Sequence, residues 1–353
     1  MLYHRATFSK FIIEDQRRTA DPRPDLTSLL NDVQTACKLI ALAVSRGALD
    51  SAGIAAPPDQ RKALHGKAND LMIGACESGG TLAGLLCKRF AEPYKIPVRY
   101  PRGKYLLAFE PIDGLSNIDV NASVGTIFSV LRCPDGVEEP TQEDFMQPGT
   151  AQVAAGYAIY GPVSMLVLTL GAGVHGFTLD PSIGAFTLSY PAMSIAPTTR
   201  EFAVNISNER YWEAPVRRYV EECIEGKEGP RAEDFTMRWV ASMVAEVHRI
   251  LVRGGLFMYP RDDKQPVRAG RFHLLYQANP MAFIVEQAGG AATTGRTRLL
   301  DVVPTSLHQR VPIILGSREE VERLVAYHAD ESYQRPPAFD TPLFQVRSLF
   351  RSA

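Results

Sequence analysis

Apolar residues recur at steps of three and four positions in several parts of the chain, which is the period of a helix with one buried face. The longest such segment covers residues 26–44, and Gly47 follows it, where a glycine cap is favoured. A second helix is expected over residues 59–75, ending before Ser78-Gly79-Gly80. Later segments of the same kind predict helices over residues 212–225, 234–253 and 317–328.

Short β-rich runs separated by Gly, Pro and Asp turns dominate residues 124–188 and predict a sheet. One example is the run 163–170, which Gly171-Ala172-Gly173 follows directly. Other expected strands lie at 104–109, near 256–259 and near 312–315. The alternation of helical and strand segments indicates an α/β protein.

A chain of 353 residues is long enough for two ordinary domains. A polar, proline-bearing stretch around residues 191–200 is the predicted boundary. We therefore expect an N-terminal domain over 1–195, a C-terminal domain over 196–335 and a surface tail over 336–353.

Composition narrows the class of protein without defining its chemistry. Hydrophobic residues make up 45% and charged residues 22%, as in a soluble globular protein. A net charge of −1 without a Lys/Arg-rich run argues against nucleic acid or a membrane surface as a partner. The five cysteines are odd in number and include no Cys-x-x-Cys pair, which indicates reduced thiols, and the first ten residues lack an apolar targeting segment. We therefore expect a cytoplasmic protein.

The candidate chemistry lies in residues 109–119, Phe-Glu-Pro-Ile-Asp-Gly-Leu-Ser-Asn-Ile-Asp. These residues follow a strand-like run, so Glu110 and Asp113 are expected at the carboxyl end of a strand, with Gly114 opening the turn after them. Carboxylates in such a place can hold Mg²⁺, while the backbone N–H groups of the turn receive a phosphate.

This string resembles the signature Asp-Pro-Leu-Asp-Gly-Ser-Ser-Asn-Ile-Asp of the class I fructose-1,6-bisphosphatases, which belong to the lithium-inhibited, Mg²⁺-dependent sugar and inositol phosphatases. Further segments that match this family, in the family's order, are 153–161, 242–249, 279–280, 286–290 and 308–312. The resemblance covers roughly residues 23–330 and implies the layered α/β sandwich of the sugar phosphatases.

The chain departs from the family at positions where acidic residues hold the metals. Asp59 and Asp113 match family acids, and Glu110 replaces an aspartate. Four further acids are matched by His65, Lys88, Arg89 and Gln277, which changes the formal charge of these four positions from −4 to +2 with His neutral. The resemblance thus implies a catalytic centre of Asp59, His65, Lys88, Arg89, Glu110 and Asp113. We expect no metal there, with Glu110 and Asp113 as the residual candidates for metal ligands.

The phosphate-binding side matches the family better. By resemblance, Asn205, Tyr259 and Arg271 grip the distal phosphate of the sugar, and Arg238 reaches in from a neighbouring subunit of a homodimer or homotetramer. Asn208 and Trp239 stand where family members often have tyrosines. At the reacting end, the implied substrate contacts are Gly114, Leu115, Ser116, Asn117 and Gln277.

Three hypotheses follow from these residues. The first is a pseudoenzyme that keeps a pocket for a sugar phosphate or another anionic molecule but lacks efficient phosphatase activity. The second is a repurposed enzyme that works without a metal, and for both we expect no cofactor. The alternative is a functioning Mg²⁺-dependent fructose-1,6-bisphosphate 1-phosphatase, a phosphoric monoester hydrolase. That alternative stays open because Lys88 and Arg89 could occupy a solvated face, His65 could be a surface residue, and Glu110 is itself a competent Mg²⁺ ligand.

Overall fold

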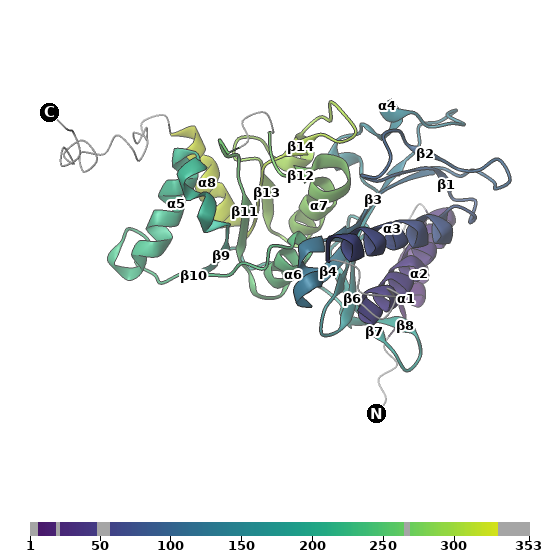
Figure 1. Cartoon of the computed structure of the whole chain (residues 1–353), viewed down its shortest axis with the longest axis horizontal. Coiled ribbons are helices and arrows are strands. Elements are labelled where there is room, and N and C mark those ends of the chain that lie inside the picture. Colours follow the sequence, from purple (N-terminus) through teal and green to yellow (C-terminus); the bar gives the residue numbers. More distant parts are fainter. Residues whose placement is uncertain (1–5, 19–21, 48–56, 265–268, 331–353) are drawn as a thin grey trace.

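The chain forms an α/β sandwich of five alternating layers, as the computed structural model in Figure 1 shows. The structure describes residues 6–18, 22–47, 57–264 and 269–330, so the predicted tail over 336–353 lies outside the described residues. Along the long axis of the molecule, the layers are helices α5 and α8, a five-stranded sheet, helices α6 and α7, an eight-stranded sheet, and helices α1 to α3 (Figure 1). The layered α/β sandwich expected from the resemblance is confirmed.

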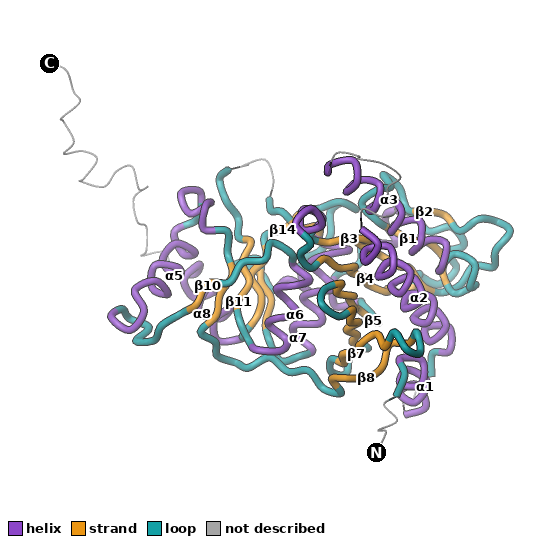
Figure 2. Tube along the Cα trace, turned by 60° about the horizontal axis from the view of Figure 1, so that its bottom comes forward, coloured by secondary structure: helices purple, strands orange, loops and turns teal. Residues whose placement is uncertain are grey.

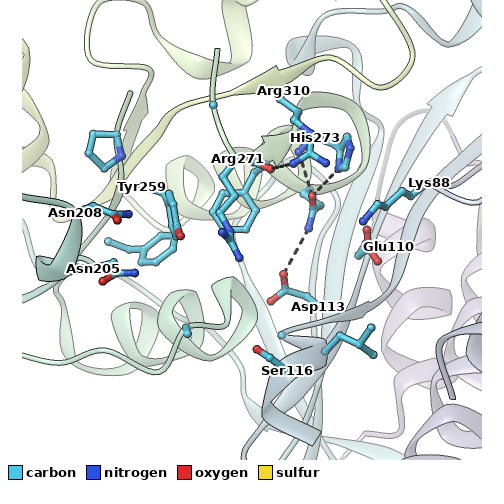
Figure 3. A pocket seen from close by; sticks show the side chains of 18 of the residues that line it. Lys88, Glu110, Asp113, Ser116, Asn205, Asn208, Tyr259, Arg271, His273 and Arg310 are labelled. Carbon is cyan, nitrogen blue, oxygen red and sulfur yellow. Dashed lines mark hydrogen bonds between the residues drawn. The ribbon is translucent and has the colours of Figure 1, made fainter. Parts of the chain in front are cut away.

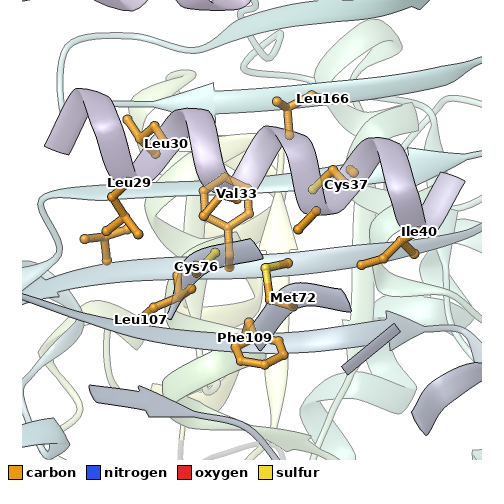
Figure 4. Close-up of a cluster of buried hydrophobic side chains, with 14 of the residues drawn as sticks. Leu29, Leu30, Val33, Cys37, Ile40, Met72, Cys76, Leu107, Phe109 and Leu166 are labelled. Atoms are coloured by element: carbon orange, nitrogen blue, oxygen red, sulfur yellow. The ribbon is translucent and has the colours of Figure 1, made fainter. Parts of the chain in front are cut away.

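Three helices cover the outer face of the eight-stranded sheet, and they are α1 (Phe8–Arg18), α2 (Pro24–Arg46) and α3 (Pro57–Cys76). Helix α2 begins with a proline in its first turn and ends at Gly47, whose φ of 48° favours a residue without a Cβ. Its apolar stripe includes Leu29, Val33 and Cys37, which pack on the sheet as Figure 4 shows. The helix predicted over 26–44 is therefore present and slightly longer.

The large sheet has the strand order β2-β1-β3-β4-β5-β6-β7-β8. Strands β1 and β3 are parallel, and the chain then meanders through antiparallel pairs from β3 to β8. The bounds of the strands are β1 Leu82–Leu86, β2 Tyr94–Lys95, β3 Tyr105–Asp113, β4 Val124–Arg132, β5 Ala154–Tyr160, β6 Ser164–Thr169, β7 His175–Asp180 and β8 Ala185–Tyr190. A short helix, α4 (Gln142–Phe145), lies between β4 and β5.

The second sheet has the order β10-β9-β11-β15-β13. Its strands are β9 Glu201–Ala203, β10 Thr236–Met237, β11 Leu256–Tyr259, β13 Ala291–Thr293 and β15 Ile313–Gly316. A separate pair is formed by β12 (Phe272–His273) and β14 (Arg310–Val311). Figure 2 shows the two sheets with α6 and α7 between them. The division of the chain into domains at residue 195 stays a prediction.

Alternation along β11 explains why this sheet is covered on both faces. Phe257 packs into the central core with α6 (Met243–Arg253) and α7 (Asn279–Gln287). Its neighbours Leu256 and Met258 point the other way, into a core shared with α5 (Ala214–Glu225) and α8 (Arg318–Ala329). Successive side chains of a strand face opposite sides, so one short strand joins two cores.

One predicted helix begins later than expected. The pattern indicated a helix over 234–253, but Thr236 and Met237 form the edge strand β10, and α6 begins only at Met243. Ala241 has a φ of 59°, which interrupts helical geometry, and the hydroxyl of Ser242 accepts a hydrogen bond from the N–H of Ala245. The apolar period alone did not reveal this break, because residues on both sides of it face the same core.

The helices of the described residues include none that is long and apolar enough to cross a membrane. All five cysteines are free, and four of them are buried.

Candidate active site

A cavity of about 640 Å³ lies where the two sheets approach each other. Figure 3 shows side chains converging on it from the carboxyl end of β3, from β11 and β12, and from the turn after β9. Of the residues expected in the site, the cavity is lined by His65, Lys88, Glu110, Asp113, Gly114, Leu115, Ser116, Asn205, Tyr259, Arg271 and Gln277. One pocket thus holds both the signature residues and the residues expected to grip a distal phosphate.

Asp113 is a deeply buried carboxylate of the cavity, with 5% of its surface exposed. Its Oδ2 accepts hydrogen bonds from the Ser242 hydroxyl at 2.9 Å and from the Val244 N–H at 3.1 Å, so it caps the first turn of α6. Burial raises the pKa of the Asp113 carboxyl to about 6, and the negative charge of Glu110 adds to this effect, although the bonds from α6 oppose it. A cation beside these two carboxylates would favour their ionised forms and so oppose the raised pKa.

Glu110 is equally buried, and its Oε1 lies 3.1 Å from Nε2 of His65 on α3. His65 therefore contacts the signature residues, as the resemblance implied. Lys88 follows β1 and lines the cavity on the same side, beside Glu110 in Figure 3. The reacting end consequently contains two carboxylates and a lysine ammonium.

Gln277 connects Asp113 to His273. The Gln277 carboxamide oxygen accepts from the His273 backbone N–H at 3.0 Å, and it lies 3.1 Å from His273 Nδ1. Its amide nitrogen donates to Asp113 Oδ1 over 3.5 Å, which is at the limit of a hydrogen bond. A single π-helical turn, Leu274–Ala278, places Gln277 directly before α7. Burial lowers the pKa of His273 to about 4, with Arg310 and Lys88 adding to the shift, so His273 is neutral at pH 7.

The signature turn is shaped by close contact with α6. Gly114 has a φ of 74°, and a Cβ built there would lie 2.7 Å from Cβ of Ser242. Asn117 is buried, and its side-chain amide donates to the carbonyls of Ser123 and Val240. Asn117 therefore holds the turn together and does not line the cavity, whereas Gly114 and Ser116 do.

The other end of the cavity is cationic and aromatic. The guanidinium of Arg271 lies 4.9 Å from the centre of the Tyr259 ring, and that ring packs against Phe272 and Trp239. Asn205 caps the turn Ile206–Tyr211 through its own side chain and also lines the cavity. This combination suits a sugar, whose ring packs on aromatic faces, with a phosphate at its end.

Three of the expected site residues do not line the cavity, namely Arg89, Arg238 and Asn117. A fourth expected residue, Asp59 on α3, has a side chain that lies outside the described part of the chain. Arg89 pairs with Asp70 at 3.0 Å with half of its side chain exposed. Arg238 donates to Glu201 at 3.1 Å and does not line the cavity of its own subunit. The third is Asn117, described above.

Four polar lining residues were not singled out by the sequence, namely Asp262, Lys264, His273 and Arg310. Arg310 donates to the carbonyl of Arg271 and so fixes the backbone before β12. The signal that could have found His273 was the string from Gly270 to Gln277, because it combines Arg271, His273 and Gln277 directly before a helix.

The fold is the layered α/β sandwich of the sugar phosphatase type. The family models for the N-terminal and C-terminal domains of fructose-1,6-bisphosphatase match residues 6–191 and 195–329. The chain is 56% identical to the class 1 fructose-1,6-bisphosphatase of Methylacidiphilum infernorum over 100% of both chains. It is 53% identical to that of Hydrogenophilus thermoluteolus over 99% of this chain and 98% of the relative. This chain belongs to the fructose-1,6-bisphosphatase family.

Solved structures agree with this assignment. The holo form of Leishmania major fructose-1,6-bisphosphatase superimposes with a TM-score of 0.84 at 36% identity, covering 93% of this chain and 100% of the other. The apo form of the same enzyme gives a TM-score of 0.82 at 37% identity, covering 92% and 99%.

These relatives overturn two expectations. The pseudoenzyme and repurposed-enzyme hypotheses are wrong, because full-length relatives more than half identical to this chain are named as fructose-1,6-bisphosphatases. The expectation that no cofactor is needed is wrong as well, because the chain belongs to a Mg²⁺-dependent family. Both expectations depended on a charge count that placed Arg89 in the catalytic centre. Arg89 instead pairs with Asp70 outside the cavity, while Glu110 and Asp113 line it.

Proposed function

We propose that this protein is a Mg²⁺-dependent fructose-1,6-bisphosphate 1-phosphatase. The observation that carries the proposal is a single cavity with two buried carboxylates at one end and an arginine beside a tyrosine at the other. A substrate with a phosphate at each end of a sugar matches this polarity. The names of the full-length relatives support the same substrate.

The residues present fit a Mg²⁺ site. Mg²⁺ in phosphate-handling sites is held by one or two carboxylates together with substrate phosphates and water, and Glu110 and Asp113 supply two carboxylates in one buried corner. The raised pKa of Asp113, caused mainly by burial and to a lesser extent by the charge of Glu110, is consistent with a site in which a cation would favour the ionised carboxyl. Bound there, Mg²⁺ would supply positive charge that stabilises the transferred phosphoryl group.

The remaining roles belong to the chain itself. The backbone N–H groups of the turn after Gly114 are offered to the reacting phosphate, and the Lys88 ammonium neutralises part of its charge. Gln277, fixed by His273, keeps the Asp113 carboxylate oriented through its amide nitrogen. His65 orients Glu110 in the same way from α3.

The distal phosphate is assigned to Asn205, Tyr259 and Arg271, with Arg238 contributed by a neighbouring subunit of a homodimer or homotetramer. Arg238 supports an oligomer because it directly follows the edge strand β10, is exposed, and does not line the cavity of its own subunit. The cytoplasm is the proposed compartment, supported by five unpaired thiols.

The test is the release of inorganic phosphate from fructose 1,6-bisphosphate by freshly purified protein, with Mg²⁺ and with EDTA. Release that requires Mg²⁺ and yields fructose 6-phosphate is expected. Absence of release at millimolar Mg²⁺, by protein that is folded according to circular dichroism, would sink the proposal.

A further inference from the structure

A lysine that the sequence did not single out stands at the distal end of the cavity. The ammonium of Lys264 donates to the amide oxygen of Asn208 over 3.2 Å. Asn208 is itself buried, with 6% of its surface exposed, and both residues line the cavity. An ammonium has three donors, and this bond uses one of them.

The backbone around Lys264 is tied to the turn that carries Asn205 and Asn208. The Asp263 N–H donates to the Tyr211 carbonyl at 3.0 Å, and Trp212 forms a β-bridge with Asp262. The Asn208 N–H donates to the Asn205 carbonyl at 3.0 Å, which sets both asparagines on one side of the turn. Lys264 is therefore held beside Asn205, at the end of the cavity where Arg271 lies.

Lys264 adds a positive charge to the distal end of the cavity, which favours binding of a dianion. Arg271, Lys264 and Asp262 are charged residues that line the cavity here, and Arg310 also lines it, with its guanidinium donating to the Arg271 carbonyl. Asp262 accepts the Lys264 backbone N–H at 3.1 Å and offsets one positive charge. Lys264 therefore leaves an excess of positive charge at this end after Asp262 has offset one cation.

We propose that Lys264, positioned by Asn208, is a specificity-determining ligand of the distal phosphate. The inference rests on the proposed function and deepens it, because it identifies what makes this subunit select a bisphosphate over a monophosphate. The side-chain oxygen of Asn208 accepts the bond from Lys264, so Asn208 positions the ammonium. Lys264 thereby replaces the tyrosine hydroxyl expected at position 208 from the family resemblance.

The experiment compares Lys264→Met with the parent on two substrates, fructose 1,6-bisphosphate and fructose 1-phosphate, which lacks the distal phosphate. The variant should raise KM for the bisphosphate about tenfold, as expected for one charge-assisted hydrogen bond, and change kcat by less than about twofold. Its kcat/KM for fructose 1-phosphate should stay within about twofold of the parent. Lys10→Met, on the exposed face of α1, is the matched control and should change neither substrate.

Asn208→Ala tests the positioning role separately. It should raise KM for the bisphosphate less than Lys264→Met does, and the double variant should be no worse than Lys264→Met alone, because the two residues act as one unit. An unchanged KM in Lys264→Met, or an equal loss with both substrates, would overturn the assignment.

Titration with fructose 6-phosphate separates this inference from the proposed function. If the parent hydrolyses nothing but binds fructose 6-phosphate about tenfold more tightly than Lys264→Met, the proposed activity fails and the role of Lys264 stands. If the parent and the variant bind it equally, or neither binds it, the role of Lys264 is refuted whatever the activity.

Discussion

The carboxylate of Asp113 accepts a hydrogen bond from the hydroxyl of Ser242, the N-cap residue of helix α6. Asp113 ends β3 of the large sheet, while Ser242 precedes a helix of the central layer, and the 2.9 Å bond between them joins segments 129 residues apart. The Val244 N–H donates to the same carboxylate oxygen. A carboxylate at this place is stabilised by the free N–H groups and the positive end of the helix dipole, so the proposed metal ligand and the packing of α6 depend on each other.

The first prediction concerns the pH dependence of stability through Asp113. The pKa of the Asp113 carboxyl is about 6 in the folded state, which is above its unfolded value. Protonation of Asp113 therefore stabilises the folded state fully below about pH 4, and this stabilisation is lost as the pH rises through about 6. Asp113→Asn lacks this titration. In EDTA it should therefore be more stable than the parent at pH 8, by on the order of 3 kcal/mol, and nearly equal to it at pH 4.

Urea denaturation of both proteins at pH 4, 6 and 8 measures the difference, and comparing them cancels the titration of other groups. Adding Mg²⁺ at pH 8 should stabilise the parent and leave Asp113→Asn unchanged. If the free energies of unfolding of the two proteins change with pH in parallel, Asp113 titrates at its ordinary pKa and the prediction is wrong.

The second prediction concerns Ser242. Ser242→Ala removes the hydroxyl that caps α6 and donates to Asp113, so we expect a loss of about 1–2 kcal/mol in the free energy of unfolding. The apparent affinity for Mg²⁺ should fall too, because Asp113 loses its orientation. Ser182→Ala, in an exposed turn, is the control for a lost hydroxyl. A variant as stable as the parent would mean that the Asp113–Ser242 bond contributes nothing to folding.

The third prediction distinguishes two neighbouring cations. Lys88 lines the cavity, whereas Arg89 pairs with Asp70 at the surface. Lys88→Met should lower kcat/KM for fructose 1,6-bisphosphate about 10- to 100-fold, since a hydrogen bond to a charged group contributes about 1.5–3 kcal/mol. Arg89→Met should stay within about twofold, because exposed ion pairs contribute little. Equal effects of the two substitutions in steady-state assays would contradict this placement.

The fourth prediction concerns assembly. Arg238 and Arg253 both donate to Oε1 of Glu201, and each adjoins exposed apolar residues, but only Arg238 is expected from the resemblance to reach a neighbouring subunit. Light scattering at micromolar concentration should show a homo-oligomer. Arg238→Met should raise KM for the bisphosphate about tenfold, and Arg253→Met should not, although both leave the same carboxylate with one partner fewer. A monomeric protein with full activity would exclude a contribution of Arg238 to a neighbouring site.

Much of the fold was predictable because it depends on local patterns. The apolar period of α2 and the four residues of β11 needed only neighbours in sequence. The late start of α6 was not predictable in this way, because it depends on the positive φ of Ala241 and on the contact of Ser242 with Asp113, far away in the chain.

By itself, the sequence determined the family, the signature carboxylates Glu110 and Asp113, and the set of residues expected to bind a sugar phosphate. These follow from residue identity and order, which the chain carries directly. Only the tertiary structure decided which side chains face the cavity. Lys88 and Arg89 are adjacent in sequence, yet one enters the site and the other pairs with Asp70, and the charge count that excluded a metal could not distinguish them. Lys264 and His273 likewise joined the site only through folding, because the direction of a side chain is set by the backbone and partners around it.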